Sequence, residues 1–124
     1  MQLTLDTALG SYYIRSYEPG KIIINNEPPI TNSIIVTAKQ LINPWQPRLV
    51  SELTAEHLVK IFELDPEVVL LGTGKQLTFP VQGLLEQFYQ NKIGIEVMNT
   101  AAACRTYNVL MSEGRRVIAA LLLG

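Results

Sequence analysis

The C-terminal part of the chain constrains the fold most, because it predicts a strand, a helix and a second strand in succession. An apolar run at residues 93–98 precedes a helix that Asn99 or Thr100 caps and that Gly114 ends. A second apolar run follows at residues 116–123. Two strands joined through a helix normally lie parallel in one sheet. This stretch therefore predicts an α/β fold.

The same alternation extends toward the N-terminus. Residues 68–71 form a short apolar run that predicts a buried strand. An amphipathic helix follows, and Pro80 suits its first position. The apolar positions of this helix recur at i, i+3, i+4 and i+7: Val81, Leu84, Leu85 and Phe88.

The N-terminal half continues the pattern. Residues 33–39 predict a strand, and Thr54 is a suitable N-cap for a helix that runs through Leu64. Residues 12–17 and 21–24 flank a Pro-Gly turn and predict a β-hairpin. We therefore expect a hairpin followed by β-α-β-α-β-α-β, with a largely parallel sheet and helices on its faces.

Length and composition fit one domain over residues 1–124. Hydrophobic residues make up 48% of the 124 residues and charged residues 17%, which is sufficient for a large core. The net charge of −1 argues against a nucleic-acid partner, since such proteins usually carry a basic surface. The single cysteine excludes an internal disulfide, and no cluster has metal-ligand spacing, so we predict no metal.

The chain is expected to be soluble and cytoplasmic. Its longest apolar run, residues 117–123, is far shorter than the roughly 20 residues that span a bilayer, so we expect no membrane insertion. Residues 1–9 lack the basic start and the long apolar run of a signal peptide. Both observations favour a reducing compartment.

A candidate site is expected at the carboxyl edge of the sheet, where open α/β folds bind ligands. Three loops, residues 43–51, 72–79 and 99–100, follow strands and precede helices. The start of the last helix would add free N–H groups that favour an anion. The candidate pocket consists of Trp45, Gly72, Thr73, Gly74, Lys75, Glu96, Asn99, Thr100, Cys104, Arg105, Tyr107 and Asn108.

Several of these residues have a purely structural alternative. Residues 72–75 (GTGK) lack the spacing of a phosphate-binding loop and favour a tight turn over a ligand cradle. Cys104 would need His57 as a base, and we predict a small buried side chain and no catalytic residue. Thr100, Cys104 and Asn108 form a polar stripe that faces a pocket or a partner, or satisfies loop backbone.

Two further residues carry open alternatives. Glu96 lies between apolar neighbours in a strand, so we expect a buried carboxylate paired with Arg105, Arg115 or Arg116. Trp45 lies between two prolines, and its ring either faces a partner protein or folds into the core.

Four motifs resemble the MTH-938-like family, a group of unknown function that includes an assembly factor of mitochondrial respiratory complex I. They lie at residues 71–74 (LGTG), 94–100 (GIEVMNT), 103–108 (ACRTYN) and 112–117 (SEGRRV). The resemblance implies a compact α/β domain with a mixed central sheet, and a soluble protein without established enzymatic activity or cofactor. Asn99 stands where an aspartate is usual in the family, which removes a charge. The chain begins without a transit segment, which favours a prokaryotic, cytoplasmic relative.

Two functional hypotheses follow. In the first, the chain is a non-enzymatic interaction protein that helps to assemble a complex with a protein partner not yet identified. In the alternative, the carboxyl edge binds a small anionic ligand or catalyses a reaction, with Lys75, Arg105 and the helix terminus as an anion site. An outward Trp45 would favour the first hypothesis. Convergence of Lys75 and Arg105 in a pocket would favour the second.

Overall fold

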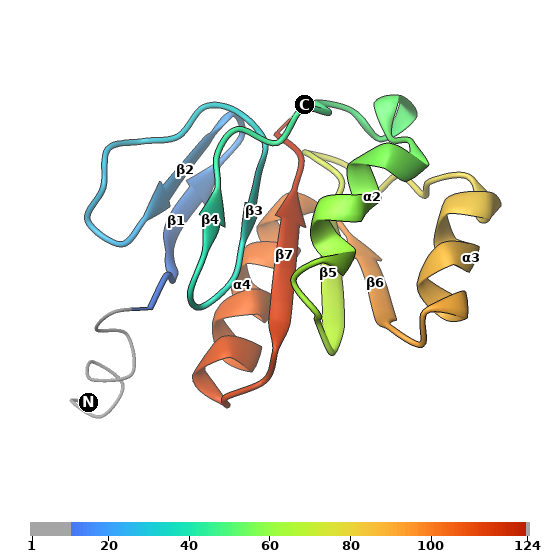
Figure 1. Ribbon diagram of the computed structural model, residues 1–124. Helices are drawn as coiled ribbons and strands as arrows, with labels where there is room; N and C mark the ends of the chain where they lie inside the picture. Colours follow the sequence, from blue (N-terminus) through green and yellow to red (C-terminus); the bar gives the residue numbers. More distant parts are fainter. Residues whose placement is uncertain (1–10, 124) are drawn as a thin grey trace.

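The computed structural model describes residues 11–123, and Figure 1 shows a central sheet with helices on both of its faces. The elements follow in the order β1 (Ile14–Glu18), β2 (Lys21–Ile24), β3 (Ile34–Val36), β4 (Leu41–Ile42), η1 (Val50–Glu52), α2 (Ala55–Phe62), β5 (Val68–Gly72), α3 (Gln82–Gln90), β6 (Gly94–Met98), α4 (Thr100–Ser112) and β7 (Val117–Leu121). The expected α/β class and the N-terminal strand pair are confirmed. The prediction about residues 1–9 lies outside the described residues.

The central sheet is mixed, with the strand order β4-β3-β7-β5-β6. Strands β7, β5 and β6 are parallel, as the helical connections between them require. Strand β3 is antiparallel to β7, so the central sheet is mixed and mostly parallel, as expected. Strand β3 is followed by β4, a two-residue strand that is too short to predict from the sequence and that pairs antiparallel with β3.

Strand β3 is antiparallel both to β4 and to β7. Because β4 runs the same way as β7, the loop after β4 still begins at the carboxyl edge of the parallel strands. The loops after β5 and β6 begin at the same edge. The three loops chosen from the sequence therefore share one edge, although the path to the first loop differs from the expected one.

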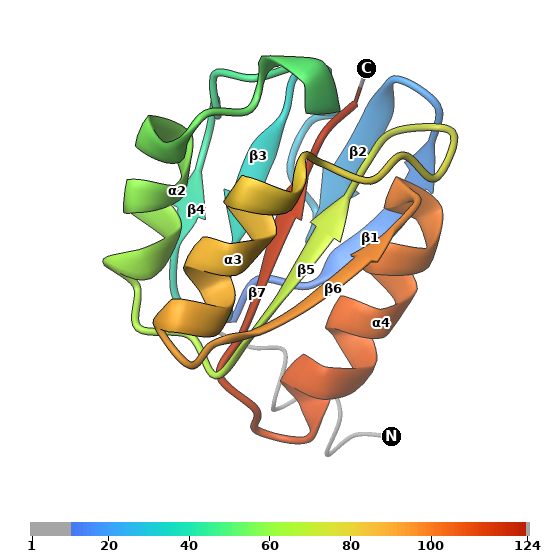
Figure 2. The same ribbon diagram turned by 90° about the vertical axis from the view of Figure 1, so that its right-hand side faces the viewer.

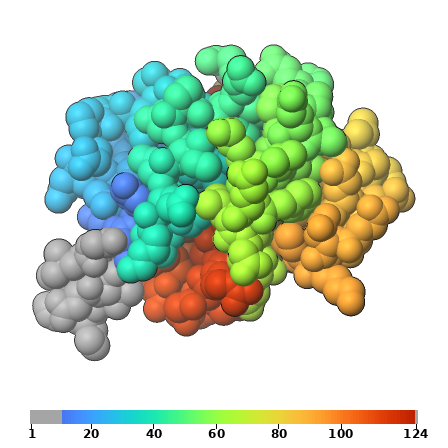
Figure 3. All heavy atoms as spheres, in the orientation of Figure 1, coloured from blue at the N-terminus to red at the C-terminus, as the bar shows by residue number. Residues whose placement is uncertain are grey.

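The strand β7 lies at the centre of the sheet, and all five of its residues are buried. On one face, α4 and the β1–β2 hairpin cover the sheet. On the other face, α2 and α3 cover it (Figures 1 and 2). Figure 3 shows α2 and α3 over that second face, with the β3–β4 segment beside α2 and atoms of the C-terminal part visible mainly along the lower edge. Apolar burial on both faces explains why β7 is almost wholly aliphatic.

The helix α2 begins as predicted and ends earlier. Thr54 is its N-cap, and the Thr54 backbone N–H donates to His57 Nδ1 at 3.1 Å. Leu53 and Leu58 are both buried, as a hydrophobic staple requires. The helix ends at Phe62, two residues before the predicted end at Leu64.

The start of α3 differs from the prediction. The first helical residue is Gln82, so Pro80 lies two positions before it and not at the first helical position. Val81 is the N-cap, and 70% of its surface is exposed, whereas helical spacing placed it on the apolar face with Leu84 and Phe88. Leu84 and Phe88 are buried as expected.

Candidate functional site

The carboxyl edge is tied together by Thr100, the first residue of α4. Its hydroxyl donates to the Leu122 carbonyl at 2.7 Å and accepts from the Gly74 N–H at 2.8 Å. Its own N–H donates to the Gly74 carbonyl at 2.9 Å. A Cβ at Gly72 would lie 2.9 Å from the Thr100 hydroxyl, so only glycine fits there. The LGTG motif thus packs the β5 end against α4.

The turn after β5 is also held by its own side chains. The Thr73 hydroxyl donates to the Gln76 carbonyl at 2.6 Å and accepts from the Thr78 N–H at 3.1 Å. Gly74 has φ +100°, a conformation that glycine tolerates. Lys75 is exposed on this turn. These contacts make GTGK a tight turn, which was the favoured alternative.

The first turn of α4 is capped by the protein itself. Asn99 is the N-cap, and its side-chain oxygen accepts from the Ala102 N–H at 2.8 Å. Because the Thr100 N–H is bonded to Gly74, two of the N–H groups expected to receive an anion already have partners. The anion site predicted here is therefore largely occupied by chain contacts.

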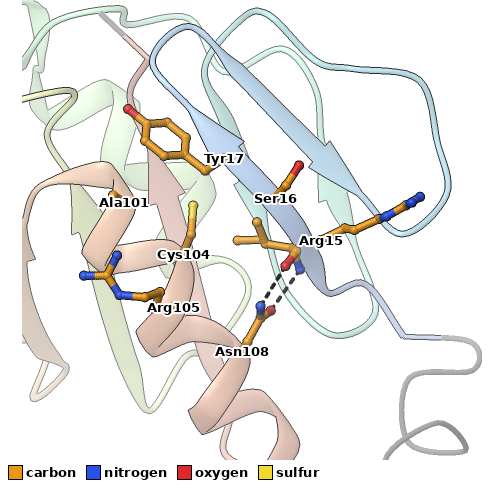
Figure 4. A pocket seen from close by; sticks show the side chains of 8 residues that line it. Arg15, Ser16, Tyr17, Ala101, Cys104, Arg105 and Asn108 are labelled. Carbon is orange, nitrogen blue, oxygen red and sulfur yellow. Dashed lines mark hydrogen bonds between the residues drawn. The ribbon is translucent and has the colours of Figure 1, made fainter.

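A hollow of about 200 Å³ lies elsewhere, between α4 and β1 (Figure 4). Of the predicted site residues, Cys104, Arg105 and Asn108 line it. The other nine predicted residues do not line this hollow. The remaining lining residues are Ile14, Arg15, Ser16, Tyr17 and Ala101. All of these except Ala101 belong to β1, which sequence reasoning did not include in the site.

Asn108 and Tyr107 attach the hairpin to α4. The Asn108 amide donates to the Ile14 carbonyl at 2.7 Å, and its oxygen accepts from the Ile14 N–H at 2.9 Å (Figure 4). The buried Tyr107 hydroxyl donates to the Tyr12 carbonyl at 2.7 Å. Of the polar stripe, Thr100 and Asn108 therefore satisfy backbone groups, in agreement with the structural alternative.

Cys104 is 4% exposed and points toward Tyr17 across the hollow (Figure 4). Burial raises the pKa of its thiol to about 12, although the nearby Arg105 guanidinium acts in the opposite direction. At neutral pH the thiol is protonated and is a poor nucleophile. His57 lies in α2, bonds to the N-cap Thr54 and does not line the hollow. Cys104 is therefore a small buried side chain, as predicted.

Of the two cations of the proposed anion site, only Arg105 lines this hollow. Arg105 is exposed beside the hollow, whereas Lys75 is not among the lining residues. Arg15, the second cation at the hollow, donates to the Asn26 side chain at 3.0 Å and points away from it (Figure 4). This hollow therefore does not combine Lys75 with Arg105, as the anion-binding hypothesis required.

The prediction that Glu96 is buried and paired was wrong. Glu96 is exposed, and the two ion pairs found among residues 11–123 do not include it. Arg115 pairs with Glu67 at 2.9 Å. The Arg116 N–H also donates to Glu67, and this bond is the main cause that lowers the pKa of the Glu67 carboxyl. The Arg-Arg motif thus joins the starts of β5 and β7.

Trp45 faces the core, which settles its two alternatives. It is 3% exposed, and its ring packs edge to face against the His57 ring, with 6.5 Å between the two ring centroids. Its backbone N–H donates to the Ser33 carbonyl at 2.8 Å. The outward Trp45 that would have favoured a partner surface is therefore absent from this loop.

Sequence reasoning missed a different apolar surface. Leu77, Phe79 and Val81, which we call the apolar loop, are 52%, 64% and 70% exposed. They alternate along the segment between β5 and α3. The available signal was two large apolar residues, Leu77 and Phe79, in a segment predicted as loop, where polar residues are usual. Val81 was predicted as part of the following helix.

Within the described chain, no three His, Cys, Asp or Glu side chains gather as a metal site. None of the helices found between residues 11 and 123 has the length and apolar character needed to cross a bilayer.

The family model described as "Protein of unknown function (DUF498/DUF598)" matches residues 14–122. A protein of Francisella tularensis subsp. holarctica named "13 kDa major membrane protein" is 28% identical over 85% of each chain. The NADH dehydrogenase (ubiquinone) 1 alpha subcomplex assembly factor 3 of Danio rerio is 32% identical. That match covers 88% of this chain and 63% of the relative, so the chain spans less than two thirds of the relative's length.

Solved structures share the fold. An NMR structure from Xanthomonas campestris has a TM-score of 0.84 and 37% identity, and covers 92% of this chain and 86% of its own. A solution NMR structure from Bordetella pertussis, described as a Mth938-like domain, has a TM-score of 0.78 and 29% identity, with 94% and 87% covered. The resemblance stated from the sequence motifs is confirmed.

Proposed function

The chain belongs to the DUF498/DUF598 family of unknown function, and from this premise we propose that it is a protein-interaction module that helps to assemble a larger complex. Relatives that are about 30% identical to this chain are named complex I assembly factor 3. The name supports a role in assembly as a class of function.

The apolar loop is the observation that carries the proposal. Leu77, Phe79 and Val81 are each more than half exposed and lie within five residues of one another. Exposed apolar side chains that gather in this way are typical of surfaces that bind other proteins. Glycines and hydrogen bonds hold the preceding turn in place, so the loop is presented on a firm support.

Co-purification from cells that express the chain tests this proposal. We expect a variant with Leu77→Ser, Phe79→Ser and Val81→Ser to lose the proteins that the native chain retains after cross-linking. The matched control carries Val59→Ser and Val109→Ser, which remove exposed apolar side chains from α2 and α4. Equal recovery of the same proteins with both variants would contradict the proposal.

The anionic-ligand or enzyme alternative has less support. Thr100, Gly74 and Asn99 bond to one another at the edge where the anion would bind. A thermal-shift screen with phosphates, nucleotides and small carboxylates provides the test. A saturable rise in Tm that Arg105→Ala abolishes would favour the alternative and contradict our proposal.

We also propose a cytoplasmic location. One relative is named a major membrane protein, which makes membrane association the competing expectation. Cell fractionation separates the two, because recovery in the membrane pellet after a high-salt wash would contradict a cytoplasmic location.

A further inference from the structure

Strand β6 forms one end of the central sheet, and no other described strand pairs with its outer edge. Figure 2 shows β6 running between α3 and α4. Five residues long and paired in regular register with β5, it contains neither proline nor lysine. Proline and lysine are the residues that usually protect an edge strand from further pairing. The opposite edge, β4, has only two residues.

The pairing with β5 determines which backbone groups of β6 face outward. Gly94 N–H donates to the Glu67 carbonyl at 3.3 Å, and the Met98 carbonyl accepts from Thr73 N–H at 2.9 Å. Because a strand alternates with a period of two, Gly94, Glu96 and Met98 bond toward β5. The N–H and C=O groups of Ile95 and Val97 therefore point to the open edge.

The side chains of β6 define what could pair there. Ile95 and Val97 are half-buried and pack against the core on the α2 and α3 side. Glu96 points to the other face, is exposed and forms no ion pair with any described residue. The open edge thus combines unpaired backbone groups with one uncompensated negative charge at its centre.

We propose that this edge binds an extended segment of a partner protein as an added strand, with a Lys or Arg of that segment opposite Glu96. Backbone hydrogen bonds to Ile95 and Val97 would supply affinity, as in other cases of strand addition. The basic residue would supply selectivity, since opposite charges across two strands attract each other.

A second copy of this chain fits the edge less well. The fullest antiparallel pairing of β6 with its own copy would place Ile95 opposite Val97. It would also place Glu96 directly opposite Glu96. Like charges in that position destabilise a strand pair. The charge therefore favours a partner with a basic residue.

The apolar loop and β6 are connected through the end of β5. Thr73, at the start of the segment that leads to Leu77, bonds to Met98 at the end of β6. The segment that carries the apolar loop therefore begins beside the carboxyl end of β6. The inference rests on the proposed function, because it names the kind of segment that the interacting partner presents.

Synthetic peptides test the inference. One probe is an eight-residue peptide of alternating Thr and Val with a central Lys, and the other carries Glu in its place. We expect the Lys peptide to shift the NMR amide signals of Ile95 and Val97 saturably and to bind about fivefold more tightly than the Glu peptide. Equal binding of the two peptides, or shifts confined to other elements, would overturn the proposal.

Two variants of one residue separate backbone pairing from side-chain contact. Val97→Pro removes the outward N–H and leaves the bonds to β5 intact, whereas Val97→Ala shortens the side chain and keeps the N–H. We expect at least a tenfold loss of Lys-peptide binding for Val97→Pro relative to Val97→Ala. Equal binding by the two would show that the edge is not used. Amide exchange in each variant checks that β5 and β6 remain paired.

The serine variant of the apolar loop separates this inference from the proposed function. If that variant loses its partners in cells and the native chain binds neither peptide, the interaction function stands and strand addition is wrong. If the loop variant keeps its partners, the proposed function fails first.

Discussion

At the scale of single residues, Gly72 occupies a position where any side chain would lie too close to its neighbours. Its missing Cβ leaves space for the Thr100 hydroxyl, the Thr100 Cα and the Leu121 side chain, which would lie 2.9, 3.0 and 3.1 Å from it. All three neighbours are part of the buried junction of β5, α4 and β7. The junction has no room to adjust.

We therefore expect Gly72→Ala to lower the free energy of unfolding by about 1–3 kcal/mol through overpacking. Urea denaturation gives the measurement. Gly83→Ala in α3 is the control, because its Cβ meets nothing within 4 Å. The control should be neutral or stabilising by up to about 1 kcal/mol, since alanine favours helix. Equal effects of the two variants would contradict the packing argument.

Cys104 predicts a dependence of stability on alkaline pH. Its pKa of about 12 in the folded chain exceeds its ordinary value of 9.0. The folded thiol thus keeps its proton where the unfolded thiol loses it. The resulting stability is complete below about pH 9 and is lost as the pH rises toward about 12.

Unfolding free energies measured between neutral pH and about pH 10.5 test this prediction. We expect the native chain to lose up to about 1.4 kcal/mol per pH unit more than Cys104→Ala above pH 9. Parallel curves for the two proteins would mean that the thiol ionises equally in both states.

At the scale of elements, the β1–β2 hairpin depends on α4 for its attachment. The Asn108 side chain bonds both backbone groups of Ile14, much as a neighbouring strand would. Its partner lies 94 residues away in sequence. No local pattern reveals such a pair, which is why the sequence left open whether Asn108 faces a pocket or a partner or satisfies backbone groups.

We expect Asn108→Ala to destabilise the fold by about 1–3 kcal/mol, because it leaves two part-buried backbone groups without partners. Hydrogen exchange should show the largest loss of protection in β1 and β2. Asn26 is an exposed residue in the turn after β2 that accepts from Arg15, and Asn26→Ala should change stability by less than about 0.5 kcal/mol. A uniform loss of protection across the sheet would argue against a local attachment.

The elements themselves were predictable where the evidence was local. Apolar runs and helical spacing located β5, β6, β7, α2 and α4, with end errors of one or two residues. The failures have non-local causes. Glu96 was expected to be buried because its neighbours are apolar, but its exposure follows from the edge position of β6 in the strand order. The direction of β3 likewise depends on pairing with β7.

At the scale of the whole molecule, the site prediction identified an edge and not a pocket. The residues of the carboxyl edge do meet, but they bond to one another. Side-chain type and spacing cannot distinguish groups that await a ligand from groups that satisfy the chain. The apolar loop was missed for the opposite reason, because Val81 has helical spacing with buried residues and yet precedes the helix.

The single tryptophan reports on the folding of the whole molecule. Trp45 packs in the core on the α2 and α3 side of the sheet, far in sequence from α3. We expect its fluorescence to resist quenching by acrylamide in the folded protein. Its change on urea unfolding should coincide with the loss of helical circular dichroism, as a two-state transition requires. Separate transitions would indicate that this side of the core unfolds independently.

The central position of β7 has a consequence for synthesis. Strand β7 is made after all the others, yet it joins β3 on one side and β5 on the other. While a ribosome is still translating residues before 117, the β3–β4 and β5–β6 pairs have no strand to connect them. Protein synthesis adds roughly 5–20 residues per second, so the nascent chain spends seconds with two apolar strand edges open. Among the described strands, β7 is therefore the one whose synthesis allows the two halves of the sheet to join.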